Sequence, residues 1–147
     1  MSERTGFEFV DGVTSDLCFV AHGAGLDEVF AAAAEAVLAA TLEAPTCLSY
    51  EVERLVTLEE PALDLLLLGF LNELVYLRDA EDLLLRPREL RVSQGRGARL
   101  EARLGGEKIC PGRHRLAAEL KAVTAHGLRV EPAEDDGGWV ATVTLDV

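Results

Sequence analysis

The stretch EPALDLLLLGFLNELVYLR, residues 60–78, decides the fold. Pro61 suits the first turn of a helix, where a missing N–H group costs no hydrogen bond. Apolar residues then recur at helical spacing: Leu63, Leu66, Leu67, Phe70, Leu71, Leu74 and Leu77. Further apolar side chains fill much of the remaining circumference: Leu65, Leu68, Val75 and Tyr76. Because a helix that is apolar nearly all round is buried on most sides, the stretch predicts a central helix.

Two polar residues, Asn72 and Glu73, stand in the second half of this helix. A buried carboxylate is costly unless something pairs with it, which makes Glu73 a candidate functional residue. The same reasoning applies to Asp16, Lys121 and Asp146, which lie beside apolar stretches. For each of them, a solvated position at the end of a helix or strand is the alternative interpretation.

The rest of the chain predicts an α+β fold built as a single domain, residues 1–147. A second helix is expected at 26–42, where alanines and an apolar face coincide. Strands are expected on either side of the two helices, and those after residue 82 run as consecutive hairpins. We expect an antiparallel or mixed sheet with both helices packed on one face. The predicted strands cover residues 7–10, 16–22, 49–58, 83–92, 98–104, 122–130 and 139–147, and residues 105–115 read as a loop.

Composition and charge restrict the function. The chain has 147 residues, of which 49% are hydrophobic, and a net charge of -12. Such a charge repels free nucleic acid, so direct nucleic-acid binding is not expected. The arginines between residues 86 and 103 fit a solvated strand face, with a local basic patch as the alternative interpretation. The sequence shows neither a bilayer-spanning run nor a secretory signal. Three cysteines without metal-ligand spacing indicate reduced thiols in a cytoplasmic protein.

The clearest ligand candidate is at the end of the chain. Asp146 stands next to the terminal carboxylate of Val147, and hard cations bind carboxylate and carbonyl oxygens. The three histidines form no HxH or HExxH pattern, and no phosphate-binding or nucleophile motif occurs. From spacing alone, the sequence indicates an acidic domain with a candidate cation site.

Several segments in order resemble the archease family over nearly the whole chain. The segments are residues 7–11, 13–16 and 26–30, then 70–76 and 79–81, then 106–107, His114, 119–126 and 145–147. The Lys-Ala-Val-Thr stretch at residues 121–124 and the terminal Asp-Val are the more specific parts.

The resemblance implies an accessory factor that is not itself an enzyme. Archeases assist the RtcB-type RNA ligase in tRNA splicing and RNA repair by promoting its guanylylation and turnover and by broadening its nucleotide use. The family binds a divalent cation, often calcium. The matching ligand positions here are Asp16, Asp146 and Val147, and the resemblance ties Glu73 and Lys121 to activity. Lys121 would neutralise Glu73 within one polar cluster.

The chain departs from the family pattern at four places. Ser15 replaces Ala in the Thr-Ala-Asp motif, and Val13 replaces a His that often precedes it. Asn72 stands where an acidic residue is common, and Ala125 stands where an aromatic residue usually follows the Lys-Ala-Val-Thr stretch. These changes affect the expected partner surface and leave the expected ligands intact.

Two other function classes fit the sequence. One is a general chaperone-like module that covers apolar patches of its partners. The other is a small metal-dependent hydrolase that uses Asp16 and Asp146 for acid–base chemistry, although no water-activating histidine accompanies them.

Overall fold

A computed structural model describes residues 6–10, 16–43, 48–117, 120–134 and 137–147. This part of the chain forms two helices and seven strands. In chain order they are β1 (Gly6–Val10), β2 (Leu17–Gly23), α1 (Leu26–Thr41), β3 (Val52–Glu60), α2 (Leu63–Glu81), β4 (Leu83–Gln94), β5 (Ala98–Lys108), β6 (Ala122–Pro132) and β7 (Trp139–Asp146). The predicted α+β class and the order of its helices and strands are confirmed.

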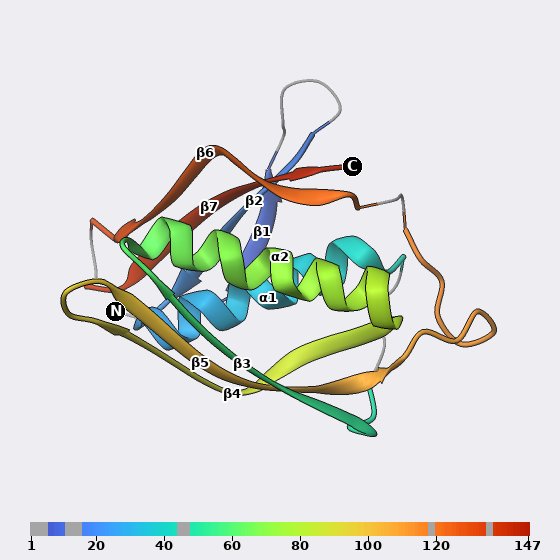
Figure 1. Cartoon of the computed structure of the whole chain (residues 1–147). Coiled ribbons are helices and arrows are strands. Elements are labelled where there is room, and N and C mark those ends of the chain that lie inside the picture. The colour runs from blue at the N-terminus through green and yellow to red at the C-terminus, as the bar shows by residue number, and fades with distance from the viewer. Residues whose placement is uncertain (1–5, 11–15, 44–47, 118–119, 135–136) are drawn as a thin grey trace.

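The strands form two antiparallel sheets rather than one. One has the order β1-β2-β7-β6 and the other the order β3-β5-β4. Figure 1 shows α1 and α2 between the two sheets. In agreement with this layering, α1 contacts both β2 and β4, and α2 contacts both β6 and β3. Each sheet therefore has one face on the helices and one outer face.

This position explains why α2 is apolar nearly all round. Leu66, Leu67, Phe70 and Leu71 are fully buried because both sheets cover the helix. Only a narrow stripe remains exposed, on which Leu65 is 42% and Tyr76 is 59% accessible. The all-round pattern thus belongs to a helix packed between layers.

Strand β5 continues through residues that read as a loop in the sequence. Gly105 and Gly106 remain in β5, which ends only at Lys108. A Cβ atom on Gly106 would lie 1.8 Å from the carbonyl oxygen of Leu84 on β4. The glycine is therefore needed for close approach of two strands and does not mark a turn.

Helix side chains close two of the sheet edges. The Asn72 side chain accepts a hydrogen bond from Val123 N–H (3.0 Å) and donates one to Val123 C=O (3.1 Å), on edge strand β6. On edge strand β4, Val92 N–H donates to Asp27 Oδ1 at 2.8 Å. An amide side chain can serve both groups of Val123, whereas a carboxylate could only accept. This gives the Asn72 departure a structural role.

The layered core predicts a large difference between two leucines of α2. Replacing Leu71, which is fully buried, with alanine should lower the free energy of unfolding by about 2–5 kcal/mol. Replacing Leu65 in the same way should cost less than about 1 kcal/mol, because that side chain is already exposed. Urea unfolding measures both values. Equal losses would contradict the burial of α2 between two sheets.

Candidate functional site

The pairing of β2 with β7 brings the two ends of the chain together. Leu17 pairs with Leu145, so the next position of the same antiparallel register sets Asp16 opposite Asp146. Leu145 is fully buried on the helix side of the sheet, and neighbouring residues of a strand point to opposite faces. Asp16 and Asp146 therefore both belong to the outer face, where each is partly exposed.

Two further predicted residues lie at this end of the sheet. Val147 follows Asp146 directly and packs partly against the core. The backbone N–H of Lys121 donates to the carbonyl oxygen of Asp146 at 2.8 Å, and the Lys121 side chain is exposed. We refer to Asp16, Asp146, Val147 and Lys121 as the terminal cluster.

The terminal cluster offers only oxygen ligands. Two side-chain carboxylates and the terminal carboxylate of Val147 form a donor set that suits a hard divalent cation. Across the described residues, no group of three or more His, Cys, Asp or Glu side chains is arranged to hold a metal ion. Residues 11–15, which include Val13 and Ser15, lie outside the described ranges.

The neutralisation of Glu73 by Lys121 within one polar cluster stays a prediction. Within the part of the chain that the structure describes, no ion pair joins these two residues. The helical geometry gives the reason. Asn72 faces β6, and Glu73 lies about 100° further round the helix. On that flank, a Cβ atom on Gly69 would lie 3.8 Å from Leu58 of β3.

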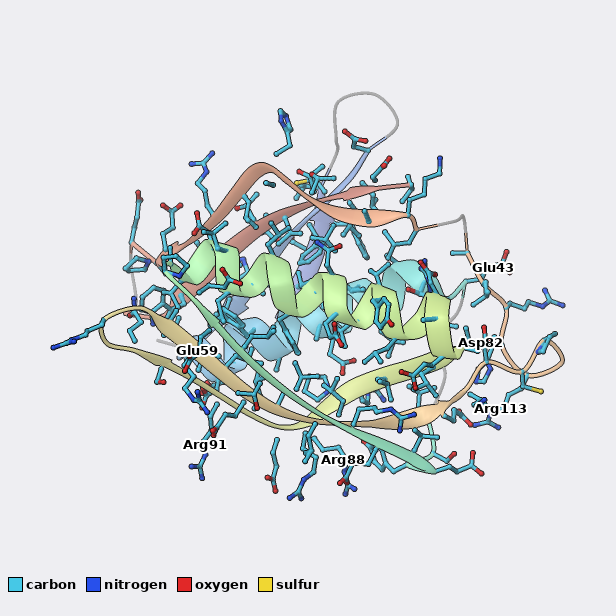
Figure 2. All side chains as sticks on the ribbon, viewed as in Figure 1. Glu43, Glu59, Asp82, Arg88, Arg91 and Arg113 are labelled. Carbon is cyan, nitrogen blue, oxygen red and sulfur yellow. The ribbon has the colours of Figure 1, made fainter. Side chains whose placement is uncertain are left out.

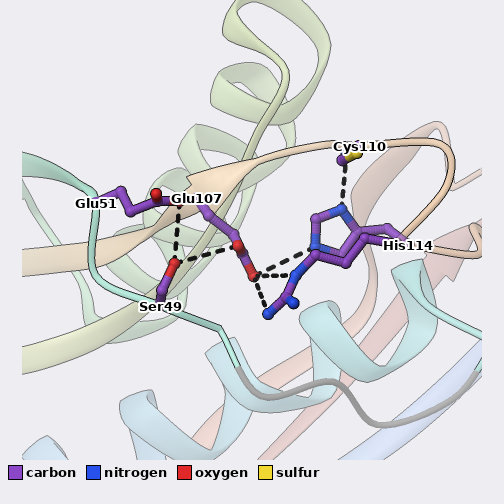
Figure 3. Close-up of polar contacts among 6 residues, drawn as sticks. Ser49, Glu51, Glu107, Cys110 and His114 are labelled. Atoms are coloured by element: carbon purple, nitrogen blue, oxygen red, sulfur yellow. Dashed lines mark hydrogen bonds and ion pairs between the residues drawn. The ribbon is translucent and has the colours of Figure 1, made fainter.

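The structure also reveals a buried polar cluster that the sequence did not predict (Figure 3). Glu107 at the end of β5 is 5% exposed, and His114 is 3% exposed. Glu107 Oε1 accepts hydrogen bonds from Arg113 at 3.2 Å and contacts His114 Nε2 at 3.3 Å. Glu107 Oε2 accepts from Ser49 Oγ at 3.2 Å. The spacing of seven residues between Glu107 and His114 gave no recognisable motif.

The hydrogen bonds of His114 determine which nitrogen carries a proton. The backbone N–H of Cys110 donates to His114 Nδ1 at 2.8 Å, so Nδ1 is an acceptor. Nε2 must then carry the hydrogen that it donates to Glu107. Ser49 bonds to the carboxylate and not to the imidazole, so this arrangement does not activate a nucleophile. His114 is a hydrogen-bonded structural histidine.

The Glu107–His114 cluster holds the segment that leads to Lys121. This segment is also fastened to the end of α1, since Glu43 N–H donates to Arg115 C=O and Ala117 N–H donates to Thr41 C=O, both at 2.9 Å. Arg78 of α2 donates to the carbonyl oxygen of Leu120. The cluster thus helps to position one side of the terminal cluster, although its own residues lie apart from it.

Two opposing effects act on the pKa of the Glu107 carboxyl. Burial raises it, and the hydrogen bonds from His114, Arg113 and Ser49 lower it. The hydrogen bonds prevail, so the pKa of Glu107 lies below its ordinary value. The ionised carboxylate is therefore the form that the folded protein favours.

The arginines between residues 86 and 103 lie mainly on the outer face of the three-stranded sheet. Figure 2 shows Arg88 and Arg91 projecting from this sheet away from the helices. Arg99 pairs with Glu59 at 2.5 Å and with Glu101 at 3.0 Å. Ion pairs across a solvated strand face account for Arg99 and Arg103, as the sequence indicated, whereas Arg86 pairs with Glu35 of α1 at 2.7 Å.

Two further sequence predictions concern membranes and thiols. Among the described helices, none is both long enough and apolar enough to cross a membrane. Cys18 and Cys110 are free thiols. Cys47 lies outside the described residues.

Comparison with known proteins identifies close relatives. The model of the Archease protein family (MTH1598/TM1083) matches residues 7–147. Protein archease of Methanosarcina mazei is 34% identical over 99% of this chain and 99% of its own length. Protein archease of Pyrococcus abyssi is 33% identical over 91% of this chain and 94% of its own length. The solution structure of Methanobacterium thermoautotrophicum protein 1598 superimposes with a TM-score of 0.81 at 33% identity, covering 97% of this chain and 99% of that one.

The lowered pKa of Glu107 predicts an acid-sensitive stability. A carboxyl whose pKa is lower in the folded than in the unfolded state stabilises the fold above its unfolded pKa, about 4.3. That stabilisation is lost as the pH falls through the folded pKa. Urea unfolding of the wild type and of Glu107→Gln should therefore differ most near neutral pH and converge below about pH 4. A difference that persists unchanged in acid would show that ionisation of Glu107 is not the cause.

Proposed function

This chain belongs to the archease family, and on that premise we propose that it is a protein cofactor of an RtcB-type RNA ligase and not a catalyst itself. In this role it promotes guanylylation and multiple turnover of the ligase, and broadens its nucleotide use, in tRNA splicing and RNA repair. The terminal cluster is the part of the molecule that acts on the ligase.

One observation carries the proposal: the pairing of Leu17 with Leu145, which, continued by one residue, sets Asp16 opposite Asp146. Carboxylates that face each other across two strands repel, and either a cation or a basic partner group relieves the repulsion. Two negative groups from opposite ends of the chain, together with the chain terminus, thus favour the binding of a positively charged group at an exposed surface.

A divalent cation bound at the terminal cluster would neutralise these carboxylates. Asp16, Asp146 and the terminal carboxylate of Val147 would hold it, with calcium as the first candidate. A bound cation would fix the end of β7 against the start of β2 and leave coordination positions for the partner. Lys121 adds a positive group beside it, because its N–H already bonds to Asp146 C=O.

The charge of the whole chain supports a protein partner over a direct grip on RNA. A net charge of -12 repels a polyanion, whereas it speeds the encounter with a basic RNA-processing enzyme. The arginines on the three-stranded sheet do not change this balance, because glutamates pair with Arg99 and Arg103 there.

The first test measures ligation by an RtcB-type ligase under multiple-turnover conditions. Adding the wild-type chain should raise product formation beyond one turnover, and Asp16→Asn, Asp146→Asn or deletion of Val147 should each reduce that stimulation at least about tenfold, or ~1.4 kcal/mol. Glu131→Gln is the matched control, because Glu131 is exposed at the opposite end of the same sheet. A wild-type chain that leaves guanylylation and turnover unchanged would refute the proposal.

The second test concerns the cation alone. Calcium at 100 times its dissociation constant should stabilise the wild type by about 2.7 kcal/mol. Asp16→Asn should abolish this effect while leaving the cation-free protein as stable or slightly more stable, because it removes a repulsion. Calorimetry with calcium and magnesium, and thermal melting with and without each ion, measure both outcomes. Stabilisation that survives the substitution would place the cation elsewhere.

A further inference from the structure

The four sheet edges of the described structure are not treated alike. Asn72 bonds to the backbone of Val123 on β6, and Asp27 bonds to the backbone of Val92 on β4. β1 is only five residues long. β3 is nine residues long, contains neither proline nor glycine, and pairs with β5 on one side alone. Proteins usually protect long edges, because unpaired backbone groups bind other strands.

The residues with free backbone groups on β3 can be named. In an antiparallel pair, every second residue directs both its N–H and its C=O away from the partner strand. Arg54 Nη1 donates to the carbonyl oxygen of Glu53 at 2.9 Å, which marks Glu53 as one of these residues. Leu55, Thr57 and Glu59 follow in the same phase. No hydrogen bond from another described segment reaches the backbone groups of these three residues on that edge.

The side chains of the same residues form the margin of the outer face. Leu55 is 74% exposed, more than any other large hydrophobic residue in the described ranges. It borders a shallow depression of about 290 Å³, whose other lining side chains include Thr57, Glu89 and Arg103. An added strand would therefore gain both main-chain hydrogen bonds and an apolar contact at Leu55.

From these observations we infer that β3 is a docking edge for an extended, basic segment of a partner protein, which adds as a fourth strand. β3 carries three glutamates and one arginine, and the arginine pairs with Glu81 of α2 at 2.7 Å. Glu59 and Glu53 also pair with Arg99 and Arg103 of β5, at 2.5 and 3.9 Å, but these are exposed pairs that contribute little, so the net charge of -12 still favours a basic segment. Cross-strand neighbours of opposite charge stabilise a sheet. The segment that fits has Lys or Arg opposite Glu53 and Glu59, with an apolar residue opposite Leu55.

A second copy of the chain fits this edge poorly. Two β3 strands that pair about Val56 would set Glu53 opposite Glu59 twice, and pairing about Leu55 would set Glu51 opposite Glu59 twice. Like charges directly opposite each other destabilise a strand pair. The net charge of -12 on each copy adds to the repulsion. The inference concerns a surface apart from the terminal cluster and does not depend on ligase activation.

Amide hydrogen exchange followed by NMR tests the edge itself. In the free protein, the N–H groups of Leu55, Thr57 and Glu59 should exchange at least about tenfold faster than those of Val56 and Leu58, which bond to β5. Equal protection of the two sets would overturn the inference. So would protection of the first set that grows with protein concentration, because the edge would then join copies of this chain.

Capped seven-residue peptides test the partner. The peptides share β-forming residues in the middle and differ only in the residue at both ends, which is lysine, serine or glutamate. Binding is followed by the same amide signals and by titration. The lysine peptide should bind at least about fivefold more tightly than the glutamate peptide and should slow exchange at Leu55, Thr57 and Glu59. Its N-methylated form keeps every charge but cannot pair with the edge, so it should not bind. Equal binding by the methylated or glutamate peptide, or no binding by any, overturns the inference.

A substitution in β3 supplies the matched protein variants. Thr57→Pro removes a free-edge N–H without removing a bond to β5, and prolines are tolerated on strand edges. Thr57→Pro should lower the affinity for the lysine peptide at least about tenfold. Thr57→Val keeps the N–H group and should bind the peptide as tightly as the wild type does. The amide spectrum of each variant reports whether the fold is intact. If Thr57→Pro does not fold, the N-methylated peptide on the wild type decides the question by itself.

Discussion

The burial of α2 between two sheets is the constraint on which the rest of the structure depends. A helix with apolar residues on nearly every side cannot be covered by one sheet, so the chain builds a second layer for the other side. The alanines of α1, several of them fully buried, give this helix a small cross-section beside α2. Both sheets consequently have one outer face, and those two faces carry the features that could meet a partner.

The strand order of the four-stranded sheet follows from the same need to cover both helices. The strand that covers the helices beside β6 is the last of the chain, and its other neighbour is β2, near the start. Pairing residues so distant in sequence brings Asp16 and Asp146 to adjacent positions of one register. The way the core is covered thus brings two acidic residues to one end of the sheet, and the proposed cation site depends on this arrangement.

Polar side chains connect the layers of the fold through hydrogen bonds. Asn72 joins α2 to β6 through both backbone groups of Val123, and Asp27 joins α1 to β4. The buried Glu107 carboxylate, with His114 and Arg113, fastens the segment after β5. Asp27 is exposed, whereas the partly buried Asn72 and the buried Glu107 and His114 all have hydrogen-bond partners, as buried polar groups require. Against this background, the uncovered edge of β3 is an exception within the described residues.

The sequence by itself determined the helices, the strands and their order, because these depend on local periodicity and turn chemistry. The all-apolar pattern of residues 63–77 required burial on most sides, and the solvated arginine face was predictable for the same local reason. Strand β5 was predicted too short, because Gly105 and Gly106 read as a turn when the close approach of β4 is unknown. Apolar surroundings made Asp16, Glu73, Lys121 and Asp146 candidates, and Asp146 beside Val147 indicated a cation site, but only the resemblance to a family joined Asp16 to that site and tied Glu73 and Lys121 to activity.

Only the tertiary structure decided which residues meet. The register of Leu17 with Leu145, continued by one residue, sets Asp16 opposite Asp146, whereas about 100° of helix rotation separates Glu73 from Asn72, which bonds to β6. The partnership of Glu107 with His114, and the free edge of β3, likewise left no signature in the sequence. The physical reason is that local patterns specify which face of a strand or helix is buried. The choice of neighbours depends instead on how both sheets pack around α2, which no single stretch of the sequence encodes.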